Sequence, residues 1–328
     1  MASTRAIIVG CDGQDGRILW DQLSDRGYAL VGIDRRSVRT HATDWAGQAT
    51  IDDASSVRHL VAEFRPEQIY YVAAHHSSSQ DTTISEPALW SSSYKVHVQG
   101  FLNFLEAARE CHRETRIFYA SSARVFGLAE NSPQTESTPV RPICLYGVSK
   151  ATGMMLGSYY RRIHGIHVST GILYNHESPW RGREFLSQRV VHGLVKVKAG
   201  LCERLEIGKL SARVDWGYAP DYTLAMQSIV EHSCPGDFII ASGVTHSVRE
   251  MIEAAAKHLG LDCESVVVEN GSILQRVPLP LCGDPAYLRR TTGWEPRVSF
   301  DEMVRILVEA AQAEILEQRC VLGGRQVF

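Results

Sequence analysis

Short apolar runs alternate with amphipathic stretches through the first half of the chain. The apolar runs predict buried strands at Ala6–Val9, Ala29–Asp34, Ile69–Ala73, Arg116–Ala120 and His167–Leu173. Apolar residues at helical spacing predict helices between them, at Arg17–Arg26, Val57–Phe64, Val98–Ala108 and Tyr146–Ile163. Strands separated by helices favour a parallel sheet with right-handed crossovers and helices on both faces.

The pattern changes after Leu173. Turn-forming and charged residues fill Asn175–Arg183, and prolines interrupt Glu269–Cys282. Further elements are predicted as helices at Phe185–Ala199, Val248–Leu259 and Phe300–Leu316, and as a strand at Asp237–Ala241. We therefore expect the α/β class, with a doubly wound parallel sheet and a smaller C-terminal substrate-binding lobe. The expected division assigns 1–174 and about 212–243 to the sheet domain, and about 175–211 and 244–328 to the lobe.

Composition narrows the classes of function. The 328 residues are 44% apolar and 22% charged, with a net charge of −3, so a nucleic-acid partner is not expected. No apolar stretch approaches the ~18 residues that span a bilayer, and the first apolar run is too short for a signal peptide. We expect a cytoplasmic protein. The eight cysteines form no C-x-x-C pair, so neither a metal site nor a disulfide framework is expected.

A glycine-rich turn follows the first predicted strand. Gly10, Gly13 and Gly16 flank Gln14 and Asp15 at the point where a helix opens. Glycines there allow a tight turn and let backbone N–H groups approach a pyrophosphate at the helix N-terminus. The strand–turn–helix context predicts a dinucleotide-binding site of the Rossmann type, with these five residues at the cofactor.

The residues after the second strand bear on the choice of cofactor. Asp34 lies 18 residues after Gly16, where a carboxylate accepts the ribose hydroxyls and repels a 2′-phosphate. Arg35 and Arg36 follow, and paired guanidiniums suit a 2′-phosphate. We favour NAD, with Asp34 and Arg35 at the cofactor, and leave NADP open.

A second motif indicates redox chemistry on a hydroxyl group. Tyr146 and Lys150 lie one helical turn apart, and Ser122 follows the strand Arg116–Ala120. An ammonium group lowers the pKa of a neighbouring phenol, so the phenolate takes a proton from a sugar hydroxyl as hydride leaves. We therefore expect Ser122, Tyr146 and Lys150 to be catalytic, with Tyr146 and Lys150 also at the cofactor.

These motifs give the chain a family resemblance over nearly its whole length. It resembles the extended short-chain dehydrogenases/reductases that act on nucleotide sugars and, more narrowly, the GDP-mannose 4,6-dehydratase family. The stretches that carry the resemblance are Gly13–Gly16, Ile69–Ala74, Leu145–Lys150, Gly171–Pro179, Asp215–Gly217, His246–Glu250 and Trp294–Arg297.

The resemblance implies further site residues. Asp52, Ala73 and Ala74 would lie at the cofactor. Asn175 and Arg249 would bind the diphosphate of a GDP-sugar, while His176 and Glu177 would face the sugar or serve as turn residues. Candidates for further phosphate or nucleotide contacts are Arg181, Arg189 and Arg213, since guanidinium groups pair with phosphate in a bidentate way.

The chain departs from the dehydratase pattern at Arg124. The resemblance puts a glutamate there, which in the dehydratases removes the C5 proton and helps expel the C6 hydroxyl. A guanidinium group cannot act as that base. Ser121–Ala123 and Val125–Gly127 instead resemble the UDP-galactose 4-epimerases, which oxidise a carbinol, turn the ketone over and return hydride to its other face. We assign Arg124 to the substrate site.

The leading hypothesis is an NAD-dependent epimerase that inverts a hydroxyl-bearing carbon of a GDP-sugar. A dehydratase with a relocated base such as Glu177, a GDP-4-ketosugar reductase and a non-catalytic sugar-nucleotide binder remain alternatives. The resemblance also implies a homodimer, built through a four-helix interface, or a homotetramer.

Overall fold

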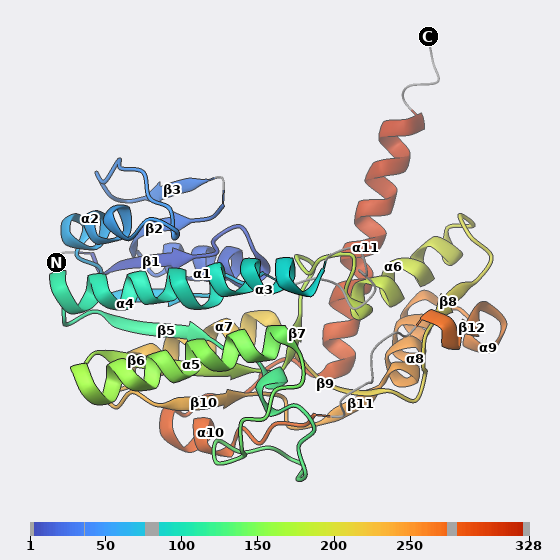
Figure 1. Cartoon of the computed structure of the whole chain (residues 1–328). Coiled ribbons are helices and arrows are strands. Elements are labelled where there is room, and N and C mark those ends of the chain that lie inside the picture. Colours follow the sequence, from blue (N-terminus) through green and yellow to red (C-terminus); the bar gives the residue numbers. More distant parts are fainter. Residues whose placement is uncertain (1–2, 36, 76–84, 274–280, 324–328) are drawn as a thin grey trace.

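The computed structural model describes residues 3–35, 37–75, 85–273 and 281–323, with side chains described as far as residue 317. A seven-stranded sheet runs through the larger part of the molecule in the order β10-β6-β5-β4-β1-β2-β3 (Figure 1). Its strands are β1 (Arg5–Val9), β2 (Ala29–Ile33), β3 (Val38–His41), β4 (Gln68–Tyr71), β5 (Arg116–Ala120), β6 (His167–Leu173) and β10 (Asp237–Ile240). All neighbouring pairs are parallel except β2–β3.

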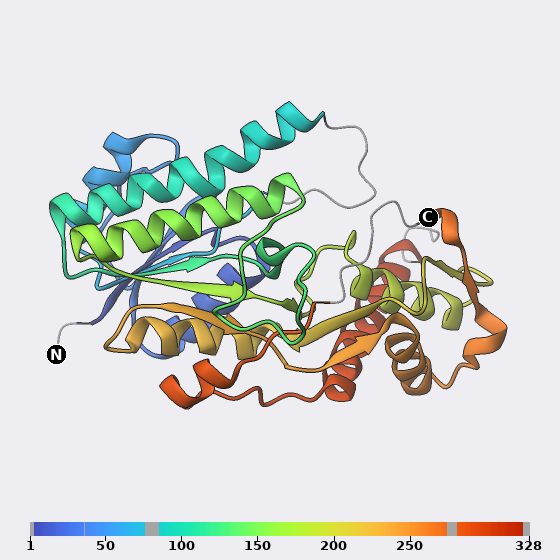
Figure 2. The same cartoon turned by 60° about the horizontal axis from the view of Figure 1, so that its bottom comes forward.

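Helices cover both faces of this sheet, which confirms the predicted α/β class (Figure 2). One face carries α2 (Ala54–Phe64), α4 (Gly100–Cys111) and α5 (Leu145–His164), and the other carries α1 (Gln14–Asp25) and α7 (Ala219–Glu231). The side chains of β1 alternate as a doubly covered strand requires. Ile7 and Val9 pack under α2 and α4, whereas Ala6 and Ile8 pack against α1 and α7.

The predicted strands of this sheet are all present, with ends that shift by a few residues. Helix α1 begins at Gln14 rather than Arg17, because the glycine turn itself forms the helix start. Strand β3 and helix α7 were not predicted. β3 is a short antiparallel edge strand of polar sequence, Val38–His41, so no apolar run marks it.

The helix predicted at Val98–Ala108 is part of a longer rod. Helix α3 (Glu86–Tyr94), a π-helical turn η1 (Lys95–Gln99) and α4 follow one another without a break. Sequence periodicity predicted the α4 segment alone, since the π turn shifts the helical phase. Such a turn widens the backbone locally and leaves carbonyl groups that need partners from outside the helix.

The C-terminal part has its own apolar cluster, and its helices lie to one side of the seven-stranded sheet (Figure 1). It lies between α6 (Leu186–Lys198), α8 (Val248–Leu259) and α11 (Phe300–Gly323). Two small sheets adjoin it, one built from β7 (Asn175–Glu177), β9 (Arg213–Tyr218) and β11 (Thr245–Ser247), the other from β8 (Leu205–Ile207) and β12 (Val267–Glu269).

The remaining short elements are the 3₁₀ turns η2 (Ala123–Phe126) and η3 (Gly271–Ile273), and the helices α9 (Cys263–Val266) and α10 (Ala286–Thr292). Most of the stretch predicted to be irregular, residues 274–280, lies outside the described residues. Among the helices that are described, none is both long and apolar enough to cross a bilayer.

Candidate active site

The candidate site lies at the carboxyl edge of the parallel strands, where ligands bind in sheets of this type. The glycine-rich turn leaves β1 there. Gly10 adopts φ +93°, and a Cβ atom at this position would lie 2.7 Å from the backbone of Ala73. Gly16 packs against the carbonyl of Gly10 so closely that any side chain would collide with it. Both glycines are therefore required by the close approach of the turn, the adjoining β4 edge and the start of α1.

This turn fits a dinucleotide. A Cβ atom at Gly13 would have open space on all sides but one, with the Gly10 carbonyl at 3.4 Å, so the start of α1 presents a free cradle. Buried polar atoms of the described site without a hydrogen-bond partner include the Ser121 hydroxyl, the Arg39 Nε and the Arg181 Nε. A helix N-terminus with a glycine cradle and unsatisfied donors nearby suits a pyrophosphate and its nucleoside.

The β1 and β2 ends place two carboxylates side by side. Asp34 accepts hydrogen bonds from the backbone N–H of Asp12 at 3.1 Å and of Arg35 at 2.7 Å. Asp12 in turn accepts one from the Ser37 hydroxyl. With Cys11, these carboxylates offer ligand atoms within 4.8 Å of one another, a spacing that would also suit a cation. Burial raises the pKa of the Cys11 thiol to about 11, however, so it stays protonated.

Sequence reasoning proposed Asp34 as a cofactor residue and did not single out Asp12, which the structure places beside it. The missing signal is three-dimensional, because Asp12 reaches Asp34 only through the pairing of β1 with β2. Arg39, also unpredicted, lies over the Trp20 ring at 4.2 Å and donates to the Cys11 carbonyl at 2.7 Å. Its Nη2 atom is thus engaged, whereas its buried Nε has no hydrogen-bond partner.

Helix α5 supplies the two predicted redox residues. Lys150 is buried and donates from Nζ to the Ala120 carbonyl at 2.8 Å, at the end of β5. Its ammonium nitrogen lies 5.9 Å from the centre of the Tyr146 ring. Ser122 follows the same strand and caps η2, accepting from the Arg124 N–H at 3.3 Å. The structure therefore brings the ends of β5 and α5 together around these three predicted residues.

The electrostatics of the pair differ from the sequence-based expectation. Burial raises the pKa of Tyr146 to about 12, although the charges of Arg181 and Arg124 act to lower it. Burial also lowers the pKa of Lys150 to about 7, against the opposing charge of Asp15. Desolvation thus outweighs any lowering of the phenol pKa by the neighbouring ammonium, because both groups sit in protein rather than water.

A polar network ties the glycine turn to the segment after β6. His176 on β7 is buried, and its Nε2 lies 3.0 Å from both carboxylate oxygens of Asp15. Gln14 donates to the His176 carbonyl at 3.1 Å and accepts from the Ser178 hydroxyl at 2.9 Å. Of the two roles expected for His176, facing the sugar or resting as a satisfied residue, the structure shows a buried ring paired with Asp15.

Glu177 is also buried and engaged. It accepts a hydrogen bond from the Ser187 hydroxyl and lies 3.6 Å from Nε of Arg181. The Arg181 guanidinium stacks over the Phe185 ring at 3.6 Å, close enough to Tyr146 for its charge to act on the phenol. Arg181 therefore lies at the site, whereas the Glu177 carboxylate is held beneath it.

The other predicted substrate residues lie at the surface or toward the C-terminal part. Arg213 on β9 donates to the Thr245 carbonyl, and Arg249 on α8 lies 3.7 Å from Glu264. Asn175 and Arg124 are exposed, and Arg189 is half-buried on α6. Of the predicted cofactor residues, Asp52 lies before α2 and is exposed, and Ala74 is exposed beside Ala73.

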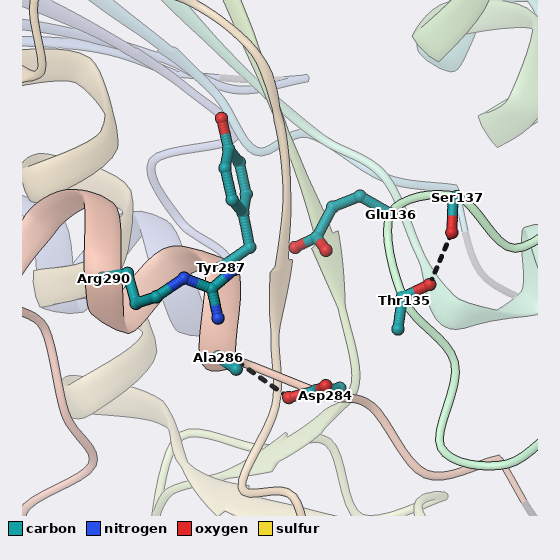
Figure 3. A pocket seen from close by; sticks show the side chains of 7 residues that line it. All are labelled: Thr135, Glu136, Ser137, Asp284, Ala286, Tyr287 and Arg290. Carbon is teal, nitrogen blue, oxygen red and sulfur yellow. Dashed lines mark hydrogen bonds between the residues drawn. The ribbon is translucent and has the colours of Figure 1, made fainter.

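A pocket of about 350 Å³ lies elsewhere, between the segment after η2 and α10 (Figure 3). Glu136 and Tyr287 face its interior, and Glu136 also accepts from the Ile239 N–H at 2.9 Å. The residues that line this pocket are Thr135, Glu136, Ser137, Asp284, Ala286, Tyr287 and Arg290, and they include no predicted site residue.

The fold and this site together define an extended short-chain dehydrogenase/reductase. Solved structures of that fold superimpose closely. UDP-glucose 4-epimerase from Thermotoga maritima, solved with UDP-glucose, gives a TM-score of 0.81 at 20% identity and covers 95% of this chain and 100% of that one. dTDP-glucose 4,6-dehydratase from Bacillus anthracis, solved with NAD, gives 0.79 at 17% identity and covers 95% and 97%.

The family model for GDP-mannose 4,6 dehydratase matches residues 7–307, and the chain belongs to this family. GDP-mannose 4,6 dehydratase from Drosophila melanogaster is 32% identical over 341 residues, covering 93% of this chain and 85% of the relative. GDP-mannose 4,6-dehydratase from Vibrio cholerae serotype O1 is 31% identical over 360 residues, covering 95% of both. The predicted family and fold are thereby confirmed.

Proposed function

We propose that this protein is an NAD-dependent epimerase of a GDP-sugar that inverts a hydroxyl-bearing carbon through a transient ketone. The observation that carries the proposal is the pairing of Tyr146 and Lys150 beside Ser122, together with a guanidinium, Arg124, on the turn that follows. The relatives' names support a GDP-linked hexose as the substrate class.

The chain's own residues account for the proton. The Ser122 hydroxyl orients the sugar hydroxyl, and the Tyr146 phenolate takes its proton as the carbinol becomes a ketone. NAD, held at the glycine turn of Gly10, Gly13 and Gly16, would supply the hydride chemistry for this oxidation and its reversal. After the ketone turns over, Tyr146 gives its proton back to the oxygen, so protons and electrons balance over the cycle. The Arg181 and Arg124 charges favour the phenolate, since both act to lower the Tyr146 pKa.

Two adjoining carboxylates support NAD over NADP. Asp34 and Asp12 stand where the adenosine ribose would lie, and a 2′-phosphate beside them would meet like charge. Arg39 lies over the Trp20 ring and donates to the Cys11 carbonyl, so its guanidinium is already hydrogen-bonded to the protein.

Dehydration is the second candidate, and the relatives favour it, since they are named GDP-mannose 4,6-dehydratases. Elimination needs a base for the C5 proton, and the resemblance puts that base at the position of Arg124. Glu177, the proposed substitute, is buried, accepts from Ser187 and lies beside Arg181. Asp15 is likewise engaged by His176. These contacts support inversion over elimination.

Incubation with candidate substrates and identification of the products test the proposed chemistry. Holoprotein carrying NAD is incubated with GDP-mannose and with other GDP-hexoses, and the sugar products are separated and identified. We expect an epimer with no net change in the cofactor, and no turnover by Tyr146→Phe. Stoichiometric consumption of reduced cofactor would indicate a ketosugar reductase, and full activity of Tyr146→Phe would contradict the assigned base.

We further propose that two copies pair through α4 and α5, which lie side by side on the outer face of the sheet domain (Figure 2). Met155, Tyr159 and Ile163 recur at helical spacing on α5 and are 61%, 51% and 63% exposed. Large apolar side chains in one exposed row are typical of an interface between subunits. An isologous dimer would bury this row of each copy in a contact made by four helices, α4 and α5 of both copies.

A further inference from the structure

A buried histidine in the π turn links the two halves of the candidate site. His97 lies in η1 and is fully buried. Its Nε2 accepts a hydrogen bond from the backbone N–H of His75 at 2.9 Å, just beyond the carboxyl end of β4. Its Nδ1 lies 2.8 Å from the Ser149 hydroxyl on α5. One imidazole ring thus joins the edge beside the glycine turn to the helix that carries Tyr146.

The hydrogen bonds fix the proton on this ring. Because Nε2 accepts from an N–H group, the neutral ring carries its proton on Nδ1 and donates it to Ser149. The Ser149 hydroxyl in turn donates a hydrogen bond to the Tyr146 carbonyl at 2.9 Å. The relay His75 N–H, His97, Ser149 and the Tyr146 carbonyl therefore has one direction and leaves each donor with an acceptor.

The ring also touches the tyrosine itself. The His97 and Tyr146 rings meet edge to face, with centroids 5.3 Å apart and an angle of 89° between their planes. The backbone of Tyr146 and its ring are thus both held from the π turn. A contact of this geometry restricts the ring rotation that would move the phenol oxygen.

The residues around the π turn bind its backbone carbonyls and leave room for the groups that do so. The carbonyls of Val96 and His97 in this turn accept hydrogen bonds from the Tyr71 and Tyr119 hydroxyls, respectively. Two glycines leave room for those phenols. A Cβ atom at Gly100 would lie 2.5 Å from the Tyr71 hydroxyl, and one at Gly153 would collide with that of Tyr119.

We infer that His97 is a positioning residue, which holds Tyr146 through Ser149 and by ring contact and, through the other ring nitrogen, holds the end of β4 at the cofactor. This inference rests on the proposed function for its kinetic consequence. Its structural content, a His97-dependent placement of Tyr146, does not need a substrate.

Two isosteric variants separate the two ring nitrogens. Asparagine places its amide nitrogen near the position of Nδ1, so His97→Asn keeps the donor to Ser149. Glutamine places its amide oxygen near Nε2, so His97→Gln keeps the acceptor for the His75 N–H. A misplaced catalytic group can cost on the order of 100-fold in rate. We expect His97→Gln to lower kcat by at least about 10-fold with little change in KM, and His97→Asn mainly to weaken NAD binding.

The kinetic arm uses NAD holoprotein with GDP-mannose as the probe. Ser149→Ala should reproduce the kcat loss, and adding it to His97→Gln should cost nothing more, because both remove one relay. Equal losses of kcat and cofactor affinity in both isosteres, or additive losses with Ser149→Ala, would overturn the inference.

A spectroscopic arm works even if GDP-mannose is not turned over. The holoprotein is labelled with 3-fluorotyrosine, and Tyr146→Phe assigns the Tyr146 resonance. We expect His97→Gln and His97→Phe to shift or broaden this resonance. His112→Phe is the matched control, since His112 lies at the other end of α4, roughly 22 Å along the helix. An unmoved Tyr146 resonance in folded His97→Gln would refute the positioning role, whereas absence of turnover by the parent would refute only the proposed function.

Discussion

His176 Nε2 lies 3.0 Å from both carboxylate oxygens of Asp15, and this contact joins the start of α1 to β7. Burial disfavours the charged form of both groups, but the attraction between the two charges outweighs this penalty. The imidazolium holds the pKa of Asp15 below 3.8, and the carboxylate holds the pKa of His176 above 6.5. The glycine turn is therefore fastened to the segment after β6 by a buried ion pair.

This pair gives folding stability a defined pH dependence. The part due to Asp15 is present above its ordinary pKa of 3.8 and is lost as the pH falls through the lower folded value. The part due to His176 is complete below 6.5 and is lost as the pH rises through the higher folded value. We expect the ion pair to stabilise the fold most between these two pH limits. His176→Gln should remove the decline in stability at alkaline pH. Melting temperatures from pH 5 to 9 measure it.

The size of the effect follows from burial. Removing one partner of a buried pair typically costs about 3–5 kcal/mol, because the other charge is left without compensation. His59→Gln is the matched control, since His59 pairs with Glu63 on the exposed face of α2. An alkaline decline that is the same in the parent and in His176→Gln would show that the pair does not stabilise the fold.

Cofactor choice should depend on both carboxylates at the ends of β1 and β2. We expect the parent to bind NAD at least about tenfold more tightly than NADP, a difference of about 1.4 kcal/mol. Asp34→Ser should narrow this ratio, and Asp12→Ser should narrow it further, since each removes charge facing a 2′-phosphate. Fluorescence titration with the two cofactors measures it. Asp25→Ser, an equal charge change at the far end of α1, should leave the ratio unchanged; equal effects from Asp25→Ser and Asp34→Ser would contradict the assignment.

The pH profile of turnover should reflect Tyr146 and Lys150 as a coupled pair. The active phenolate–ammonium form carries the same net charge as the form in which both are neutral. Its share is therefore constant above the first titration and falls once both groups are protonated. Since the pKa of Lys150 is about 7, we expect kcat/KM to fall as the pH drops below about 7. Lys150→Met should abolish this limb along with most activity, and a flat profile from pH 5 to 8 in the parent would contradict the pairing.

The proposed dimer has a direct test in solution. Tyr159→Glu and Met155→Glu place charge in the exposed row of α5, and we expect both to halve the molar mass measured by light scattering. Leu201→Glu is the control, since Leu201 is comparably exposed but follows α6 in the C-terminal part. Parent protein that is monomeric at micromolar concentration would contradict the interface.

Local pattern predicted most of the sheet and the motifs around which the candidate site is built. Buried parallel strands read as apolar runs, and the glycine turn and the Tyr146–Lys150 spacing are both local, so each was visible in the sequence. β3 was missed because three of its four residues are polar, and α7 because it is buried on most sides and lacks a clear amphipathic period. The expected domain division remains a prediction, which limited proteolysis of the apoprotein would test.

The contacts that distinguish this site are long-range. Asp12 meets Asp34 across a strand pair, His176 meets Asp15 across 161 positions, and His97 meets Ser149 across 52. The periodicity of apolar residues reports on single helices and strands, so it does not predict such long-range pairs. The net pKa of Tyr146 was also beyond the sequence, because it depends on how far the fold desolvates the phenol.

The central claim, transient oxidation without loss of water, is tested most directly by carrying out the reaction in D₂O. Holoprotein with NAD is incubated with GDP-mannose and the other GDP-hexoses, and the product is examined by NMR. Hydride that leaves and returns within the site carries no solvent deuterium, so we predict a sugar inverted at one carbinol with its C6 hydroxyl intact and no deuterium on carbon. A 4-keto-6-deoxy product with deuterium from the solvent would contradict the account.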